Sequence, residues 1–184
     1  MDAFRFELSA GEKAYLKETV TLSIAAALRG DADWLPTEPP TPRLREPFGV
    51  FVTLKIQGQL RGCIGYVASD QPVYQNIARM AKAAAFEDPR FPPLNKAEYG
   101  LLEVEISILS PVTPCPDPAL ITVGRHGLIV RQGMRQGLLL PQVPLEWGWD
   151  RETFLAHTCQ KAQLPPDAWK RKDTEILWFE AEVF

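Results

Sequence analysis

Residues 48–67, FGVFVTLKIQGQLRGCIGYV, carry β-branched and aromatic side chains on both sides of a central glycine turn. Phe48 to Gln57 is typical of a strand, Gly58-Gln59 of a hairpin turn, and Leu60 to Val67 of the partner strand. The sequence therefore predicts an antiparallel hairpin at residues 48–67.

Helices and a third strand are predicted around this hairpin. Pro72 opens a segment with one apolar helical face, which stops near Asp88-Pro89. Leu101 to Leu109 alternates apolar with polar residues, as a strand does when one of its faces is wet or paired. A first helix is predicted at Gly11 to Leu28, and prolines between Gly30 and Pro47 predict an irregular connection.

The second half of the chain repeats the order of hairpin, helix and strand. Leu128 to Gln132 and Gly137 to Leu140 predict a hairpin, Arg151 to Ala162 a helix capped by Asp150, and Thr174 to Phe184 a strand. A single offset of 75 residues aligns Gly62 with Gly137 and also Glu105 with Glu180. We therefore predict a single domain, residues 1–184, with pseudo-repeats at about 48–109 and 123–184.

Two such units, with about six strands, predict an α+β fold. The sheet is expected to be mostly antiparallel, with a barrel-like form as one option, and the helices are expected to pack outside it.

Composition excludes several classes of protein. The 184 residues are 46% apolar and 23% charged, close to the averages of folded globular domains. The net charge of −3 gives no general attraction to nucleic acid or to anionic lipid. No run approaches the 18 apolar residues of a membrane span, and Met1 to Glu7 lacks the pattern of a secretory leader.

The cysteines indicate a reducing compartment. Cys63, Cys115 and Cys159 are odd in number and far apart in the chain, which favours free thiols over a disulfide framework. We therefore expect a cytoplasmic protein.

The most unusual segment is Leu60 to Gly65, because two glycines within a strand mark a bulge or a close approach by a ligand or another backbone. Strand alternation puts Arg61 and Cys63 on one face, where the guanidinium would favour a reactive thiolate. The alternative is that Cys63 is a small buried side chain and that Arg61 pairs with Glu105 on a neighbouring strand.

Asp88 to Phe91 and His126 are the other candidate site elements. Arg90, in an extended turn after Pro89, could bind a carboxylate or phosphate, or could simply pair with a surface acid. His126 could act as a base for Cys63, although a lone histidine in a loop is more often a hydrogen-bonding turn residue.

The pattern predicts neither a metal nor a nucleotide cofactor. The sequence has no Cys-x-x-Cys or His-x-x-x-His spacing and no phosphate-binding loop. Lys170-Arg171-Lys172 beside Trp169 is the only basic run in a sequence of net negative charge, so nucleic-acid binding is not expected. Trp147-Gly148-Trp149 is expected to be partly exposed and to offer a partner surface.

The hexapeptide Leu60-Arg61-Gly62-Cys63-Ile64-Gly65 resembles the signature of the AMMECR family. The resemblance runs from about Tyr15 to Phe184 and also includes 85–91, 104–111, 126–128, 140–143 and Trp147. One departure is Gln163, where glycine is expected as a helix C-cap. The resemblance implies an α+β fold with a duplicated unit, a cleft lined by Leu60 to Gly65, and partnership with a Memo-like, dioxygenase-family protein and a radical SAM protein.

Two hypotheses of function result. The first is a non-catalytic module that binds these partners through the surface around Leu60–Gly65. The second is an enzyme or enzyme subunit that uses Cys63 as a nucleophile or redox thiol on a small anionic or peptide substrate. The candidate catalytic residues are Cys63, Arg61 and His126, and the candidate substrate-binding residues are Leu60, Gly62, Ile64, Gly65, Asp88, Arg90 and Glu105.

Overall fold

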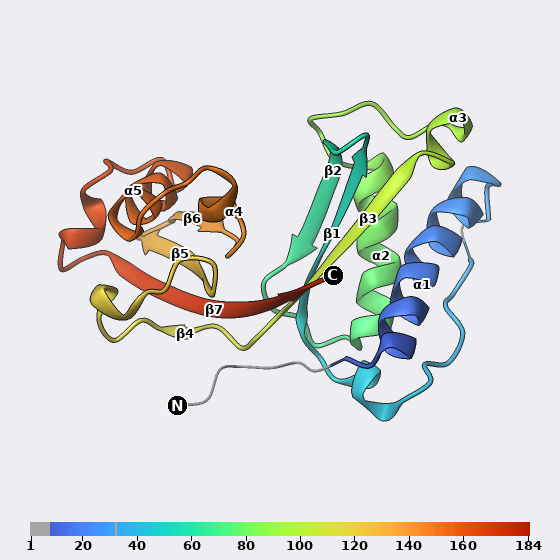
Figure 1. Cartoon of the computed structure of the whole chain (residues 1–184), viewed down its shortest axis with the longest axis horizontal. Helices are drawn as coiled ribbons and strands as arrows, with labels where there is room; N and C mark the ends of the chain where they lie inside the picture. The colour runs from blue at the N-terminus through green and yellow to red at the C-terminus, as the bar shows by residue number, and fades with distance from the viewer. Residues whose placement is uncertain (1–7, 32) are drawn as a thin grey trace. The chain divides into compact units, whose positions relative to one another are not determined.

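Figure 1 shows the computed structural model of the chain, which describes residues 8–31 and 33–184. Residues 1–7, considered above for a leader segment, lie outside the described residues. The chain forms two compact units. The N-terminal unit contains the described residues up to Leu109 together with Glu182–Phe184, and the C-terminal unit contains Ser110–Ala181.

The N-terminal unit is built on the predicted hairpin. Strand β1 (Gly49–Ile56) pairs antiparallel with β2 (Gln59–Tyr66) on one side and with β3 (Leu102–Leu109) on the other. The turn is Gln57-Gly58, one residue earlier than expected, and both residues have positive φ angles of 51° and 73°. Two successive residues with positive φ form the turn whose twist matches a two-residue hairpin, and so Gln59 joins the strand.

Two helices cover one face of these strands. Helix α1 (Ala10–Leu28) begins with a capping box between Ser9 and Glu12, and buries Leu16, Val20 and Ile24. Helix α2 (Val73–Phe86) packs on β1 and β2, and α1 packs on α2, as Figure 1 shows. The connection between α1 and β1 is irregular apart from a short 3₁₀ turn, η1 (Pro42–Arg45). A short helix that the sequence reading missed, α3 (Lys96–Tyr99), precedes β3.

The C-terminal unit has the same order of hairpin, helix and strand. Strand β5 (His126–Gln132) pairs antiparallel with β6 (Arg135–Leu139) and with β7 (Glu175–Val183), whose other side meets the short β4 (Thr113–Pro114). Helix α5 (Arg151–Lys161) packs on β5 and β6 and is capped by Asp150 as predicted. The remaining elements are η2 (Pro118–Leu120), α4 (Val143–Glu146) and η3 (Ala168–Lys170).

Each unit packs a helix tightly against a glycine of its hairpin. A Cβ on Gly62 would lie 2.0 Å from the carbonyl oxygen of Ala84 in α2, and one on Gly137 would lie 2.2 Å from the nitrogen of Ala162, just after α5. Any larger residue at either position would push the helix away from the strand. These two glycines therefore occupy matching places in the two units.

The strand registers differ from the single 75-residue offset. The hairpin ends Ile56–Gln59 and Gln132–Arg135 are related by 76 residues, from 56 to 132 and from 59 to 135. In the first unit, Glu105 of β3 lies opposite Thr53 of β1. In the second unit, Glu180 of β7 lies opposite His126 of β5, and the residue of β1 that is 76 positions before His126 is Val50, not Thr53. The two acids are therefore not equivalent, and the internal duplication itself stays a prediction.

The predicted fold class is confirmed, because helices pack on antiparallel strands in both units. The last residues of β7 join the N-terminal unit, where Phe184 and Ile106 exchange backbone hydrogen bonds of 2.9 and 3.1 Å. No helix among residues 8–31 and 33–184 has the length and apolar character that crossing a membrane requires.

Candidate functional site

Arg61 has a carboxylate partner that the sequence did not identify. Its Nε and Nη2 atoms donate to the two carboxylate oxygens of Glu98 at 2.8 and 3.0 Å, and Nη2 also donates to the Pro92 carbonyl at 2.9 Å. The alternative in which Arg61 pairs with Glu105 is wrong, because the carboxylate that binds the Arg61 guanidinium is Glu98 on α3. Arg61 is only 9% exposed, and the Glu98 carboxylate already compensates its charge within the N-terminal unit.

Glu105 instead belongs to a polar row that crosses three strands. Thr53 of β1 lies opposite Cys63 of β2 and also opposite Glu105 of β3, so the three side chains share one face. Lys55 Nζ binds Glu105 at 3.0 Å. Because Gly62 faces α2, the row lies on the face of the strands that α2 does not cover.

The Cys63 thiol has no structural support for a thiolate. Its Sγ accepts a hydrogen bond from Thr53 Oγ1 at 3.2 Å, but burial raises the pKa of the thiol. The Thr53 hydrogen bond and the Arg90 charge both lower the pKa, and burial outweighs them. At neutral pH Cys63 is therefore a protonated thiol, contrary to the activation by Arg61 considered above.

Asp88 and Arg90 cover the free edge of β2. The Asp88 carboxylate, with a side chain only 2% exposed, accepts from Cys63 N at 2.9 Å and from Arg90 Nη2 at 2.7 Å. Arg90 Nη2 in turn approaches the Cys63 carbonyl at 3.4 Å. The hydrogen bonds from Arg90 hold the pKa of Asp88 far below its usual range. This pair therefore satisfies the backbone of an edge strand.

The remaining hexapeptide residues divide between packing and exposure. A Cβ on Gly65 would lie 2.2 Å from the Val50 carbonyl oxygen, so Gly65, like Gly62, is required by close packing within the unit. Leu60 is 41% exposed, and Ile64 is half-buried. The structure thus brings Leu60 to Gly65 together with Asp88, Arg90 and Glu105 in the N-terminal unit.

His126 belongs to the C-terminal unit, where it is the first residue of β5 and only 7% exposed. Its Nδ1 accepts a hydrogen bond from the Thr122 backbone N–H at 3.0 Å, which places the proton of the neutral ring on Nε2. Burial lowers the pKa of His126, although the Glu180 charge acts in the opposite direction. His126 is therefore neutral at pH 7.

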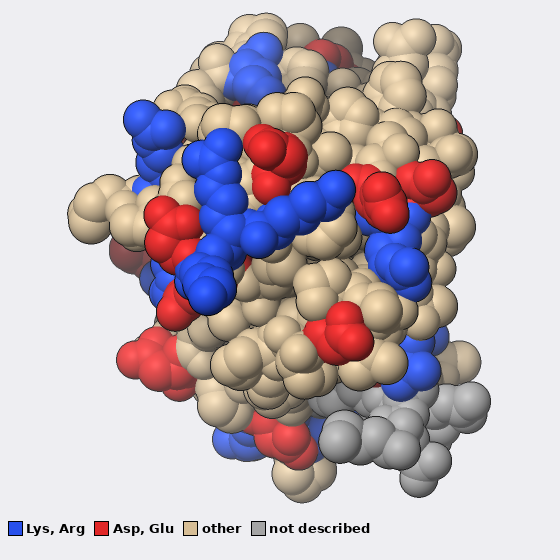
Figure 2. All heavy atoms as spheres, turned by 90° about the vertical axis from the view of Figure 1, so that its left-hand side faces the viewer, with Lys and Arg blue, Asp and Glu red and all other residues tan. Residues whose placement is uncertain are grey.

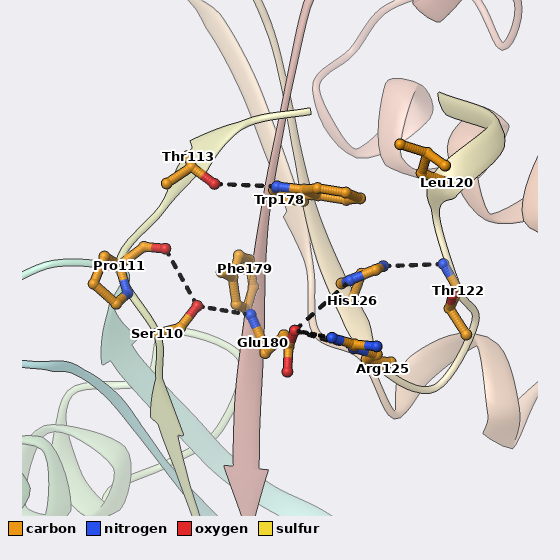
Figure 3. Close-up of a pocket in the computed structure, with 10 residues that line it drawn as sticks. All are labelled: Ser110, Pro111, Thr113, Leu120, Thr122, Arg125, His126, Trp178, Phe179 and Glu180. Atoms are coloured by element: carbon orange, nitrogen blue, oxygen red, sulfur yellow. Dashed lines mark hydrogen bonds and ion pairs between the residues drawn. The ribbon is translucent and has the colours of Figure 1, made fainter. Parts of the chain in front are cut away.

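A cavity of about 460 Å³ opens beside His126. Figure 3 shows Arg125, His126 and Glu180 pointing toward one another, with Trp178 next to the histidine ring. Arg125 Nε and Nη2 both donate to Glu180 Oε1, at 3.0 and 2.9 Å, and His126 Nε2 lies 3.9 Å from the same oxygen. Every residue that lines this cavity comes from the C-terminal unit.

The tryptophan loop is exposed, as expected. Trp147 is 70% exposed and stacks on Trp149, whose ring stacks on His157 with centroids 3.9 Å apart. His157 is half-buried by this stacking. Cys159 is fully buried in the core.

Neither the basic run at residues 170–172 nor the described His, Cys, Asp and Glu residues form a recognisable nucleic-acid or metal site. Arg171 lies 3.6 Å from Asp167, and Lys170 lies over the ring of Trp169. The face drawn in Figure 2 carries Lys and Arg side chains interspersed with Asp and Glu. Across the described residues, no three His, Cys, Asp or Glu side chains form a group that could hold a metal ion.

Sequence reasoning missed Glu98, Thr53, Arg125, Trp178 and Glu180. A local signal existed for Glu98, because Asn95-Lys96-Ala97-Glu98 has the spacing of a capping box, and Asn95 does cap α3. Glu180 was noticed only as a repeat of Glu105. Its partners lie about 55 residues away, and no local pattern could identify them.

The chain is similar to proteins of one known family. The AMMECR1 family model matches residues 18–184. A protein from Thermococcus gammatolerans is 50% identical over 159 residues, which cover 81% of this chain and 78% of that protein. A protein from Methanothermobacter thermautotrophicus is 44% identical over 184 residues, which cover 96% of this chain and 95% of that protein.

A solved structure agrees with the fold. The crystal structure of an uncharacterized protein from Pyrococcus horikoshii matches with a TM-score of 0.88 and 43% identity, over 94% of this chain and 89% of that one. Because the family model covers nearly all of the chain and relatives at this identity span most of its length, the chain belongs to the AMMECR1 family.

Proposed function

We propose that this AMMECR1-family protein is a partner-binding module that uses the surface around Leu60–Gly65, and that it acts without cysteine chemistry. One observation carries the proposal: the two arginines named as candidate site residues are already bound to carboxylates, Arg61 to Glu98 and Arg90 to Asp88. A substrate anion would have to displace a bidentate partner from Arg61, which is largely buried.

The state of Cys63 supports the same choice. A nucleophilic cysteine requires a thiolate or a neighbouring base, and burial raises the pKa of this thiol instead. Thr53, which contacts Sγ, is a donor to it and cannot take its proton at neutral pH. The alternative function, an enzyme with Cys63 as nucleophile or redox thiol, thus lacks a group that would activate it among these contacts.

The contact surface is proposed to consist of side chains rather than strand backbone. Asp88 and Arg90 occupy the edge of β2 at Cys63, so an added strand would meet an edge already covered at its centre. Leu60 and Tyr66, near the two ends of β2, are 41% and 45% exposed. Large exposed apolar side chains of this kind are typical anchors of an interface.

The partners follow from the family resemblance. We propose a Memo-like, dioxygenase-family protein and a radical SAM protein from the same cell, with a cytoplasmic location for all three. The test is to mix the purified chain with each of these proteins and to measure association by size-exclusion chromatography and biolayer interferometry.

A matched pair of variants locates the surface. Leu60→Glu is expected to weaken association at least about tenfold, as loss of an interface anchor does. Leu22→Glu changes a leucine of similar exposure, 43%, on α1 and is expected to leave association unchanged. If Leu60→Glu and Leu22→Glu associate equally well, the surface around Leu60 is not the contact surface. If the unmodified chain associates with neither the Memo-like protein nor the radical SAM protein, the proposed partners are wrong.

A further inference from the structure

The cavity of the C-terminal unit has the features of a small-molecule site. Its volume of about 460 Å³ lies within the range of about 300–1,000 Å³ typical of ligand pockets. Trp178, Leu120 and Pro111 supply apolar lining, and Arg125, His126 and Glu180 supply the polar groups. An apolar pocket with a few convergent polar groups is the arrangement that orients a small ligand.

The polar groups are only partly satisfied by one another. Both Arg125 bonds go to Oε1 of Glu180, so within the described residues Glu180 Oε2 and Arg125 Nη1 make no hydrogen bond. His126 Nε2–H also makes none, because 3.9 Å to Glu180 Oε1 is beyond hydrogen-bond length. The site therefore holds one spare acceptor beside two spare donors.

The charges and the aromatic ring define the ligand class. Arg125 and Glu180 neutralise each other and the His126 ring is neutral, so the pocket favours neither a free anion nor a free cation. Trp178 is held in place by the hydrogen bond from its Nε1 to Thr113 Oγ1, at 3.1 Å, and by the His126 ring, with centroids 4.4 Å apart. A fixed indole ring of this kind is a stacking surface for a flat molecule.

We propose that this cavity binds a small, uncharged, planar ligand that carries an amide or an amide-like edge. The ligand carbonyl oxygen accepts from His126 Nε2–H and Arg125 Nη1, and the ligand N–H donates to Glu180 Oε2. The ring system of the ligand packs against Trp178. The site lies in the C-terminal unit, and its lining shares no residue with the partner surface around Leu60.

The test compares three probes of nearly the same shape and different charge: benzamide, benzoate and benzamidine. Each is titrated into the ¹⁵N-labelled full chain, and the shifts of backbone amides near His126 and of the Trp178 indole N–H are followed. Benzamide is expected to bind about tenfold more tightly than either charged probe. The absence of saturable shifts with benzamide, or equal affinity for all three probes, would overturn the proposal.

Charge variants then test the assigned roles. Glu180→Gln leaves Arg125 unpaired and is expected to shift the preference toward benzoate by about tenfold, whereas Arg125→Gln leaves Glu180 unpaired and is expected to shift it toward benzamidine. The control is Glu175→Gln, which breaks the similar Arg131–Glu175 pair outside the cavity and is expected to leave the preference unchanged. An unchanged order of probes in a folded Glu180→Gln variant contradicts these roles. The ¹⁵N spectra report folding directly, and the probe comparison in the unmodified chain does not depend on any variant.

Discussion

The Asp88 carboxylate accepts a hydrogen bond from the backbone N–H of Cys63 at 2.9 Å and thereby holds the α2–α3 loop against the edge of β2. The same carboxylate binds Arg90, so one buried acid satisfies both a strand edge and a guanidinium. The element expected from sequence to bind substrate is therefore part of the framework around Cys63.

Asp88→Asn is expected to destabilise the protein by about 1–3 kcal/mol near neutral pH, because the charge-assisted hydrogen bonds from Arg90 become weaker. The pKa of Asp88 is lowered in the folded state, so its contribution is complete above the unfolded value of about 3.9 and is lost as pH falls toward the folded pKa. Urea unfolding at pH 7, 5 and 3 should show that the difference in free energy of unfolding between the parent and Asp88→Asn becomes smaller only at pH 3.

The exposed Asp173 provides the control for this variant. Asp173→Asn is expected to change the free energy of unfolding by less than about 0.5 kcal/mol at every pH. An Asp88→Asn variant as stable as the parent at pH 7 would contradict the role assigned to this carboxylate.

Cys63 is expected to react with iodoacetamide faster than Cys159, which is fully buried, but with a pH midpoint above the roughly 8.5 of a free thiol. Thr53→Val removes the donor to Sγ and should raise the midpoint further, since that hydrogen bond lowers the thiol pKa. Mass spectrometry of the alkylated cysteines across pH 6–10 measures the reaction rates and the pH midpoint. A midpoint below that of a free thiol would restore the nucleophile hypothesis.

Gly62→Ala is expected to destabilise the chain by about 1–3 kcal/mol or more, because its methyl group would overlap the Ala84 carbonyl oxygen of α2. Gly137→Ala should have a similar effect in the C-terminal unit, where its methyl group would lie 2.2 Å from the Ala162 nitrogen. Gly11→Ala is the control, since its Cβ meets no atom within 4 Å, and alanine in the first turn of α1 is expected to leave stability unchanged or to raise it slightly. Thermal unfolding distinguishes the three variants, and a neutral Gly62→Ala would contradict the close packing.

Gln163→Gly is expected to stabilise the protein by about 0.5–1 kcal/mol. Gln163 follows α5 with a positive φ of 58°, a conformation that glycine adopts without steric cost. The expected rise in the thermal midpoint is about 1–4 °C for a chain of this size. Gln160→Gly, within α5, should instead lower stability by about 1 kcal/mol, so the two substitutions are expected to have opposite signs.

The local elements and the family could both be predicted from the amino-acid sequence. Both hairpins, α2, α5 and its Asp150 cap follow from spacing and capping within a few residues, and the structure confirms them. The glycine expected after α5 was also a correct reading of the backbone, because Gln163 adopts the conformation that glycine prefers. These features depend on neighbours within about one turn of chain, so local patterns are enough to predict them.

The contacts between distant side chains, in contrast, depend on the tertiary structure. Arg61 finds Glu98 at a separation of 37 residues, and Arg125 finds Glu180 at a separation of 55. Such pairs depend on strand register and on the course of loops, and a shift of one residue moves a strand side chain to the opposite face. For that reason the sequence indicated Arg61, Cys63 and His126 as candidates, whereas the fold paired Arg61 with Glu98, left Cys63 half-buried with a raised thiol pKa, and assigned His126 to a cavity with Glu180 and Trp178.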